Sequence, residues 1–321
     1  MTVVFVLEQS AQSTEQIAQF MKAKTYIPGE TKAERKARKR KEKASSTKQQ
    51  NANEGCRPLD ESITHVSAPA KLPINPTQEA VVPSYTNSQP KYVVCLKYGT
   101  KYDASYVNKL YDMVTRNLTI DHEFVCFTED TNGLYPHIRT ESLPDLPISG
   151  WWYKPYFFAP SLPLTGTILF LDLDMIIFRN IDKLFTHDPN NFYIIRDFNR
   201  HVIKNYQKFN SSIFRLNTGQ HSEVWTNFKA NADSIMRRYH GDQDWIRVCI
   251  TQNFNFWPDE WVQSYKWEMR DKAKLNSSPK GKRDFASNGM PTVKAETSIA
   301  VFHGDPNPHN CKDQWVIDNW K

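Results

Sequence analysis

Two carboxylates end a strongly apolar segment in the middle of the chain. Residues 168–178 read ILFLDLDMIIF, which places Asp172 and Asp174 two positions apart directly after the apolar run. Side chains two residues apart on an extended strand point to the same face, so both carboxylates can reach one cation. Carboxylate oxygens are ligands for hard divalent ions, and such an ion can neutralise a diphosphate leaving group. The spacing therefore predicts a divalent-cation site where a buried strand ends, the edge at which open α/β sheets bind ligands.

Four further segments combine polar and aromatic residues that such a site could use. They are WWYKP at 151–155, FNSSIFRLNTG at 209–219, GDQDWI at 241–246 and FHGDPNPH at 302–309. Each segment also has an ordinary structural interpretation. A lysine can extend to solvent, an Asp can cap a helix, a His at a strand end can bond a carbonyl, and tryptophans usually belong to the core. The segments become candidates for a site because they accompany the Asp pair.

Strands that alternate with helices after residue 90 predict an α/β sheet able to carry these residues. Strands are expected at 92–96, 123–128, 168–171, 192–195, 212–216 and 298–302, and helices at 104–116, 222–238 and 242–250. Asp103 can cap the first helix, whose apolar residues recur on one face. The first strands are expected to be parallel, and the last one runs directly into His303.

The first 90 residues have a different character. Residues 1–25 predict a short strand and a helix, whereas residues 26–90 are first basic and then Pro-rich, with few apolar residues in any period. Such a segment is expected to be a largely disordered arm or linker. Residues 31–50 hold nine basic and two acidic residues, a net +7 in a chain whose total is +6. The remainder is near neutral, which disfavours a nucleic-acid-binding body and assigns any contact with a polyanion to residues 31–50.

Cysteine usage and hydropathy indicate the cellular setting. The five cysteines are scattered without a CxxC spacing, which argues against a structural zinc site or a disulfide framework. No stretch approaches the roughly 18 apolar residues of a membrane helix. The start of the chain lacks the basic region and cleavage site of a signal peptide. The sequence therefore favours a cytoplasmic protein without a membrane span.

The Asp pair and the four segments together resemble the GT-A glycosyltransferases of family 8, the glycogenin and lipopolysaccharide galactosyltransferase type, and more closely their small bacterial and phage-encoded relatives. The resemblance covers roughly residues 91–310. It implies an α/β, Rossmann-like GT-A fold of nucleotide-diphospho-sugar transferases with a mixed central sheet over residues 91–321, preceded by the largely disordered arm. The implied activity is metal-dependent transfer of a sugar from a nucleotide-diphosphate donor. A UDP-sugar is the expected donor, and the anomeric configuration of the sugar is expected to be retained. The acceptor stays open between a glycan, a protein, a small molecule and modified DNA.

The same resemblance assigns roles to residues of this chain. The residues assigned to a bound Mn²⁺ or Mg²⁺ ion are Asp172, Asp174 and His303. Those assigned to catalytic contact with the donor sugar and its phosphates are Lys154, Asp242 and Gln243. Those expected to bind the nucleotide are Leu96, Lys97, Tyr98, Gly99, Lys154 and Gly304.

One position departs from the family pattern. The C-terminal motif of the family usually continues from His-Gly to Lys-Pro, with the Lys on the diphosphate, whereas this chain reads HGDPNP with Asn307 at that place. Asn307 carries no charge. Either another base such as Lys154 or Lys312 therefore supplies the charge, or the diphosphate is bound more weakly.

Two other classes of protein compete with this interpretation. A haloacid-dehalogenase-like phosphatase also has a D-x-D after an apolar strand, with the first Asp as nucleophile. That motif normally opens its domain, whereas about 80 residues of α/β pattern precede Asp172 here. The other alternative is a non-catalytic protein that binds nucleic acid or a scaffold through the basic arm.

Overall fold

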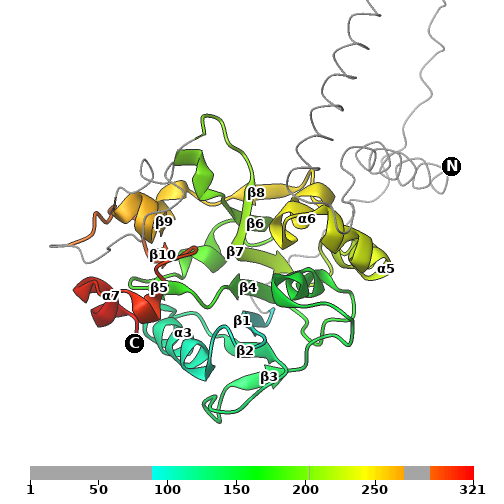
Figure 1. Cartoon of the computed structure of the whole chain (residues 1–321), viewed down its shortest axis with the longest axis horizontal. Helices are drawn as coiled ribbons and strands as arrows, with labels where there is room; N and C mark the ends of the chain where they lie inside the picture. The colour runs from blue at the N-terminus through cyan, green and yellow to red at the C-terminus, as the bar shows by residue number, and fades with distance from the viewer. Residues whose placement is uncertain (1–88, 202, 271–289) are drawn as a thin grey trace, which may run out of the picture. The chain divides into compact units, whose positions relative to one another are not determined.

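The computed structural model describes residues 89–201, 203–270 and 290–321 (Figure 1). The chain divides into two units, Met1–Ser84 and Tyr85–Lys321, and every described residue belongs to the second. The predictions for residues 1–25, and those for the linker up to residue 88, therefore lie outside the described residues.

A mixed sheet of seven strands forms the centre of the described unit, in the order β3-β2-β1-β4-β7-β6-β8. Strands β3, β2, β1 and β4 are parallel, β7 is antiparallel to both of its neighbours, and β6 pairs with β8 in parallel. The strands span Lys91–Lys97 (β1), Glu123–Thr128 (β2), Arg139–Glu141 (β3), Thr167–Leu171 (β4), Phe192–Arg196 (β6), Phe209–Asn217 (β7) and Phe254–Phe256 (β8). The expected α/β class is confirmed, and so is the parallel pairing of the first strands.

A second, three-stranded sheet in the order β5-β10-β9 lies beside the first. Its strands are Met175–Ile177 (β5), Ile299–Val301 (β10) and Val262–Ser264 (β9). The helices are α3 (Ala104–Asn117), α4 (Lys183–Thr186), α5 (Glu223–Arg238), α6 (Asp242–Cys249) and α7 (Gln314–Asn319). The 3₁₀ helices are η1 (Gly150–Phe158), η2 (Phe198–His201), η3 (Asp259–Trp261) and η6 (Pro308–Asn310), and η4 (Tyr265–Met269) is a π-helical turn. As predicted, Asp103 caps α3, because its side chain accepts a hydrogen bond from the Ser105 backbone.

Alternating side chains of the central strands supply two cores, one on each face of the large sheet. Val93 of β1 belongs to the core shared with α3, α7 and the small sheet. Val94, the next residue, belongs to the core shared with η1, α5 and α6. Figure 1 shows these two sets of elements on opposite sides of the strands. Strand side chains alternate between faces, so a sheet covered on both sides needs the nearly continuous apolar strands of this sequence.

Arg215 bonds the segment from α4 to the start of β6, and this role was not predicted from the sequence. This residue of β7 is fully buried, and its guanidinium donates hydrogen bonds of 2.6 to 3.2 Å to backbone carbonyls. The accepting carbonyls, all at the end of α4 and in the following turn, belong to Leu184, Phe185, His187, Asp188 and Asn191. Burial lowers the pKa of Arg215 to about 10, so the group stays charged at neutral pH.

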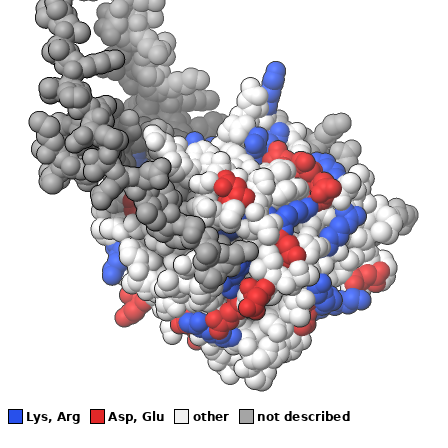
Figure 2. All heavy atoms as spheres, turned by 180° about the vertical axis from the view of Figure 1, so that it is seen from behind, with Lys and Arg blue, Asp and Glu red and all other residues white. Residues whose placement is uncertain are grey.

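The surface of the described unit carries both signs of charge. On the face in Figure 2, Lys and Arg side chains are interspersed with Asp and Glu side chains and form no single basic patch. In the ranges that the structure covers, no helix combines the length and apolar character needed to cross a membrane.

Candidate active site around the Asp172–Asp174 loop

The Asp pair lies on the loop that joins the two sheets, between β4 and β5. The backbone N–H of Asp172 donates to the Ser212 carbonyl of β7 at 2.9 Å, and the Phe302 N–H donates to the Asp174 carbonyl at 3.0 Å. Between them, the Leu173 side chain is buried in the core on the small-sheet side. Both ends of the D-x-D are thus fixed by backbone hydrogen bonds, one to each sheet, which holds the carboxylates in a defined place.

Lys154 extends from η1 and joins two of the predicted carboxylates. Its Nζ lies 2.8 Å from Oδ1 and 2.9 Å from Oδ2 of Asp172, and 3.9 Å from Oδ2 of Asp242. Ser211 completes the group, because its hydroxyl donates to Asp242 Oδ2 at 2.6 Å. Burial would lower the pKa of Lys154, but the charges of Asp172 and Asp242 raise it above its usual value. Lys154 is therefore a buried, charged member of the site, and its interpretation as a surface lysine is wrong.

Tyr102 connects the second carboxylate to the C-terminal segment. Its hydroxyl lies 2.8 Å from Asp174 Oδ2 and 3.2 Å from Asn307 Oδ1. Burial, and next the charge of Asp172, raise the pKa of Asp174 to about 6, while the hydrogen bond from Tyr102 works in the opposite direction. No motif in the sequence marks Tyr102, which lies between β1 and α3.

The two carboxylates fit a hard divalent cation. Both offer oxygen ligands, and burial together with the charge of Asp172 makes ionisation of Asp174 costly in a way that a bound cation would relieve. Lys154 already occupies both oxygens of Asp172, so a cation would share that carboxylate with the ammonium group. Within the described ranges, no three His, Cys, Asp or Glu side chains are grouped as a metal site, so His303 does not join the Asp pair in this geometry.

His303 directly follows the segment that pairs with the D-x-D loop, yet its ring has other partners. Nε2 lies 2.6 Å from the Ser264 hydroxyl, and the ring stacks on Phe198 with centroids 5.4 Å apart. The Trp267 ring packs edge-on against the His303 ring, with centroids 4.5 Å apart. Burial, and next the charge of Lys266, lower the pKa of His303 to about 3, so the ring is neutral at pH 7. A neutral imidazole can ligate a metal, and Nδ1 is the nitrogen left for it.

The predicted Asp–Gln pair opens α6. Gly241, and not Asp242, is the N-cap of this helix, so the interpretation of Asp242 as a cap is wrong. Gln243 Nε2 donates to Asp197 Oδ2 at 3.3 Å, which adds a fourth carboxylate that the sequence reasoning missed. The sequence does contain a signal for Asp197, since this residue follows the apolar strand β6 as Asp172 follows β4.

Trp151 packs against Gly241 but remains 46% exposed, so the expectation of a core position is wrong for Trp151.

The residues expected to cradle the nucleotide base take different positions at the end of β1. Leu96 and Lys97 are buried, and Lys97 Nζ bonds the carbonyl of Asp130 at 3.1 Å. Gly99 has a φ of +55°, which favours glycine in this turn. The ring of Tyr98 packs against that of Tyr153 in η1, with centroids 6.2 Å apart. Burial, and next the charge of Asp172, raise the pKa of Tyr98 to about 12.

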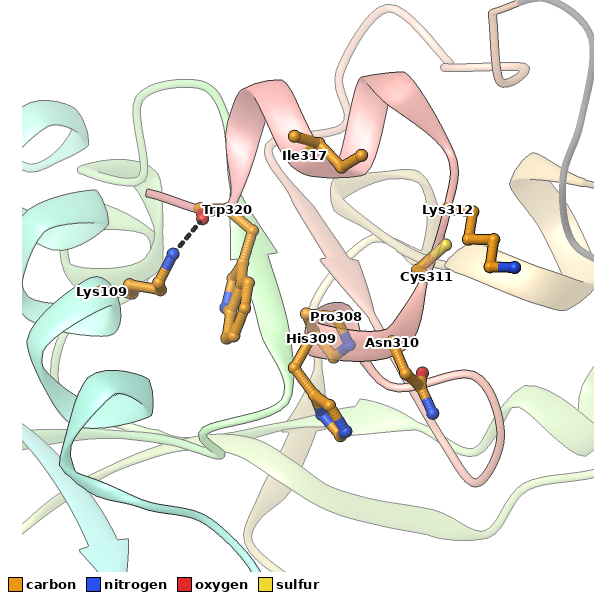
Figure 3. A pocket seen from close by; sticks show the side chains of 8 residues that line it. All are labelled: Lys109, Pro308, His309, Asn310, Cys311, Lys312, Ile317 and Trp320. Atoms are coloured by element: carbon orange, nitrogen blue, oxygen red, sulfur yellow. Dashed lines mark hydrogen bonds between the residues drawn. The ribbon is translucent and has the colours of Figure 1, made fainter.

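The two lysines considered as substitutes for the family lysine at Asn307 have other positions. Lys154 is engaged by Asp172, as described above. Lys312 lines a separate cavity of about 590 Å³ between α3 and α7 (Figure 3). The cavity is lined by Lys109, Pro308, His309, Asn310, Cys311, Lys312, Ile317 and Trp320. None of the predicted site residues lines it.

Comparison with solved structures identifies the architecture. The structure resembles that of the glycosyltransferase GlyE of Streptococcus pneumoniae TIGR4, with a TM-score of 0.51 and 11% sequence identity, over 72% of this chain and 60% of that chain. The chain therefore shares the fold of GlyE, a GT-A fold. It spans less than two thirds of the length of GlyE.

The galactosyltransferase LgtC, solved with donor and acceptor sugar analogs, is a further structural match. It has a TM-score of 0.47 and 14% identity, over 71% of this chain and 95% of that chain. No protein-family model and no curated protein sequence matches the chain. The likeness to GlyE confirms the fold class expected from the sequence.

Proposed function

We propose that this protein is a metal-dependent glycosyltransferase that moves a sugar from a nucleotide-diphosphate donor to an acceptor. One observation carries the proposal. The paired carboxylates Asp172 and Asp174 are fixed at the end of a central parallel strand, with the Lys154–Asp242 pair beside them, in the GT-A fold. In open α/β sheets, ligands bind at the ends of such strands.

The residues of the site divide into three groups by their chemistry. Asp172 and Asp174 would hold Mn²⁺ or Mg²⁺, with His303 as a further candidate ligand, and the ion would neutralise charge on the leaving diphosphate. Lys154, Asp242 and Gln243 lie beside the pair and are proposed to orient the donor sugar. The proposed nucleotide contacts are Leu96, Lys97, Tyr98, Gly99 and Gly304.

The topology favours this proposal over the phosphatase alternative. In the described part of the chain, the D-x-D follows the fourth strand, β4, rather than the first. The lysine nearest to Asp172 forms a bidentate ion pair with it, so Asp172 is held as a charged partner rather than exposed as a nucleophile. A carboxylate in an ion pair is a weaker nucleophile because its negative charge is already stabilised.

A thermal-shift screen tests the proposal. Full-length protein is heated with Mn²⁺ and each of UDP-glucose, UDP-galactose, GDP-mannose and ADP-glucose, and slow release of free nucleoside diphosphate is then measured without acceptor. We expect at least one nucleotide sugar to raise the melting temperature, and only when the metal is present. A UDP-sugar is the first candidate. NMR of the transferred sugar would show whether the anomeric configuration is retained. Hydrolysis of simple phosphate monoesters with no response to any nucleotide sugar would support the phosphatase instead.

A further inference from the structure

The 3₁₀ helix η1 is fixed to the core by one of its faces. Residues three apart lie on the same face of such a helix. Trp152, Pro155 and Phe158 are buried, and the Trp152 ring stacks on that of Phe228 in α5, with centroids 5.7 Å apart and planes inclined by 10°. The remaining faces of η1 are therefore held in defined directions relative to the core.

Trp151 and Lys154 share another face of η1, one turn apart. The Lys154 ammonium group approaches Asp242, and the Trp151 indole lies against Gly241, the residue before Asp242. A Cβ on Gly241 would lie 3.4 Å from Nε1 and 3.7 Å from Cδ1 of the indole, so the pyrrole side of the ring faces the backbone at the start of α6. This face of η1 thus meets two consecutive residues of the candidate site.

Much of the Trp151 side chain remains open to solvent at the edge of the site. Trp151 is 46% exposed, whereas Lys154, one turn later on the same face, is buried. An indole that is held in place and half exposed beside buried polar groups offers a flat apolar surface to a ligand. Aromatic side chains beside a few polar groups are typical of sites that bind small molecules.

We propose that Trp151 is the platform on which a neutral sugar ring of the acceptor stacks. The inference rests on the proposed function and deepens it, because it names a carbohydrate as the acceptor. Asp242 and Gln243 are proposed to orient the donor sugar, and Trp151 contacts Gly241 directly before them. A ring stacked on Trp151 would therefore lie beside the transferred sugar, with the C–H bonds of its apolar face against the indole.

The charges near Trp151 favour a neutral ring over a nucleic-acid strand. Asp242 and Asp244 lie in the first turn of α6, directly after the glycine that contacts the indole. Lys154, on the same face of η1 as Trp151, is already paired with carboxylates. A strand that stacked a base on Trp151 would bring its phosphates close to these acidic groups, whereas a neutral sugar carries no such charge.

Fluorine NMR can observe this ring directly. Full-length protein labelled with 5-fluorotryptophan is saturated with Mn²⁺ and whichever of UDP, GDP and ADP binds most tightly. It is then titrated with lactose, maltose, cellobiose and N,N′-diacetylchitobiose. The Trp151 resonance is identified by its absence from Trp151→Phe, and we expect at least one of the disaccharides to shift it.

The outcomes separate this inference from the proposed function. If a nucleoside diphosphate binds but no disaccharide shifts the Trp151 resonance, the platform is refuted and the proposed function stands. A shift caused by single-stranded oligothymidylate, and by none of the sugars, would likewise overturn the platform. If none of the three diphosphates binds with Mn²⁺, the proposed function fails and this inference fails with it.

Transfer kinetics with the responding disaccharide measure what the ring contributes. Trp151→Ala removes the indole, Trp151→Phe keeps a smaller ring, and the matched control Tyr135→Ala removes a 37% exposed ring between β2 and β3. We expect the KM for the disaccharide to rise about 10-fold in Trp151→Ala, about threefold or less in Trp151→Phe and less than about twofold in the control. A disaccharide that shifts the resonance but accepts no sugar would overturn the assignment to the acceptor.

Two control measurements distinguish acceptor binding from donor binding and from folding. The dissociation constant of the nucleoside diphosphate should change by less than about twofold in Trp151→Ala, and a loss of about 10-fold would place Trp151 on the donor instead. Because Trp151 is half exposed, the ligand-free Trp151→Ala variant should melt close to Tyr135→Ala.

Discussion

Removing the charge of Lys154 is the most direct test of how the site is built. The change Lys154→Met keeps an unbranched side chain of similar length and deletes the ammonium group. It leaves Asp172 without the partner at 2.8 Å and Asp242 without the one at 3.9 Å. Both carboxylates are then held in place by the fold, one by the loop between the sheets and one by Ser211.

The magnitude follows from the burial of this group. Lys154 side-chain exposure is 8%, and that of Asp242 is 7%, so solvent does little to screen the pair. Breaking a buried ion pair by removing one partner costs about 3–5 kcal/mol, because the remaining charge stays buried. For a domain of this size, each kcal/mol lowers the melting temperature by about 2–4 °C. We therefore expect Lys154→Met to melt about 6–20 °C below wild type.

The response to metal distinguishes this explanation from a general packing defect. Without Lys154, a divalent ion meets no competing ammonium group on Asp172. Scanning calorimetry with and without Mn²⁺ should thus show a larger metal-induced rise in the variant than in wild type, with Lys294→Met as the unaffected control. A variant that melts within 2 °C of wild type, or that gains no more from Mn²⁺, would refute the reasoning.

Further predictions concern the metal, the sheet, pH and the arm. Asp174→Ala should abolish Mn²⁺-dependent donor binding in calorimetry while lowering the melting temperature little, and undiminished binding would exclude Asp174 as a ligand. Arg215→Met should destabilise the fold by about 4 kcal/mol or more in urea unfolding, since it leaves buried carbonyls unpaired. Burial would raise the pKa of Glu268, but its bonds with His201 and Arg200 lower it below 4.5. The stability it provides is therefore present above pH 4.5 and lost as the pH falls below it, so Glu268→Gln should flatten that part of the stability curve. A chain that begins at Gln89 should retain the donor-induced thermal shift but lose low-salt retention on a polyanion column.

Local patterns in the sequence were sufficient for the large elements. The strand expected at 123–128 is β2 residue for residue, and the helix expected at 104–116 differs from α3 by one residue. Both are long enough to show a full apolar period and have clear ends. The Asp pair was also predictable, because an abrupt change from apolar residues to two acids marks the end of a buried strand.

Contacts between distant segments could not be predicted in the same way. The strands β5, β8 and β9 have three residues each, too few to show a period. Tyr102 reaches Asp174 from 72 positions away, and Arg215 caps α4 from about 30 positions away. Such pairs depend on topology rather than on neighbouring residues, so no motif marks either partner.

The small sheet gives the site a structural coupling that the D-x-D alone lacks. Strand β10 pairs with both β5 and β9, so the segment before Lys266, the segment before His303 and the residues after Asp174 form one hydrogen-bonded unit. The other end of the Asp pair is bonded to β7 of the large sheet, through Asp172 and Ser212. The Asp172–Asp174 loop therefore connects the large sheet, at Ser212 of β7, with the small sheet, at Phe302 after β10. A shift of the small sheet would therefore move Asp174 relative to Asp172, so the β5–β10 pairing helps to fix the positions of the two carboxylates.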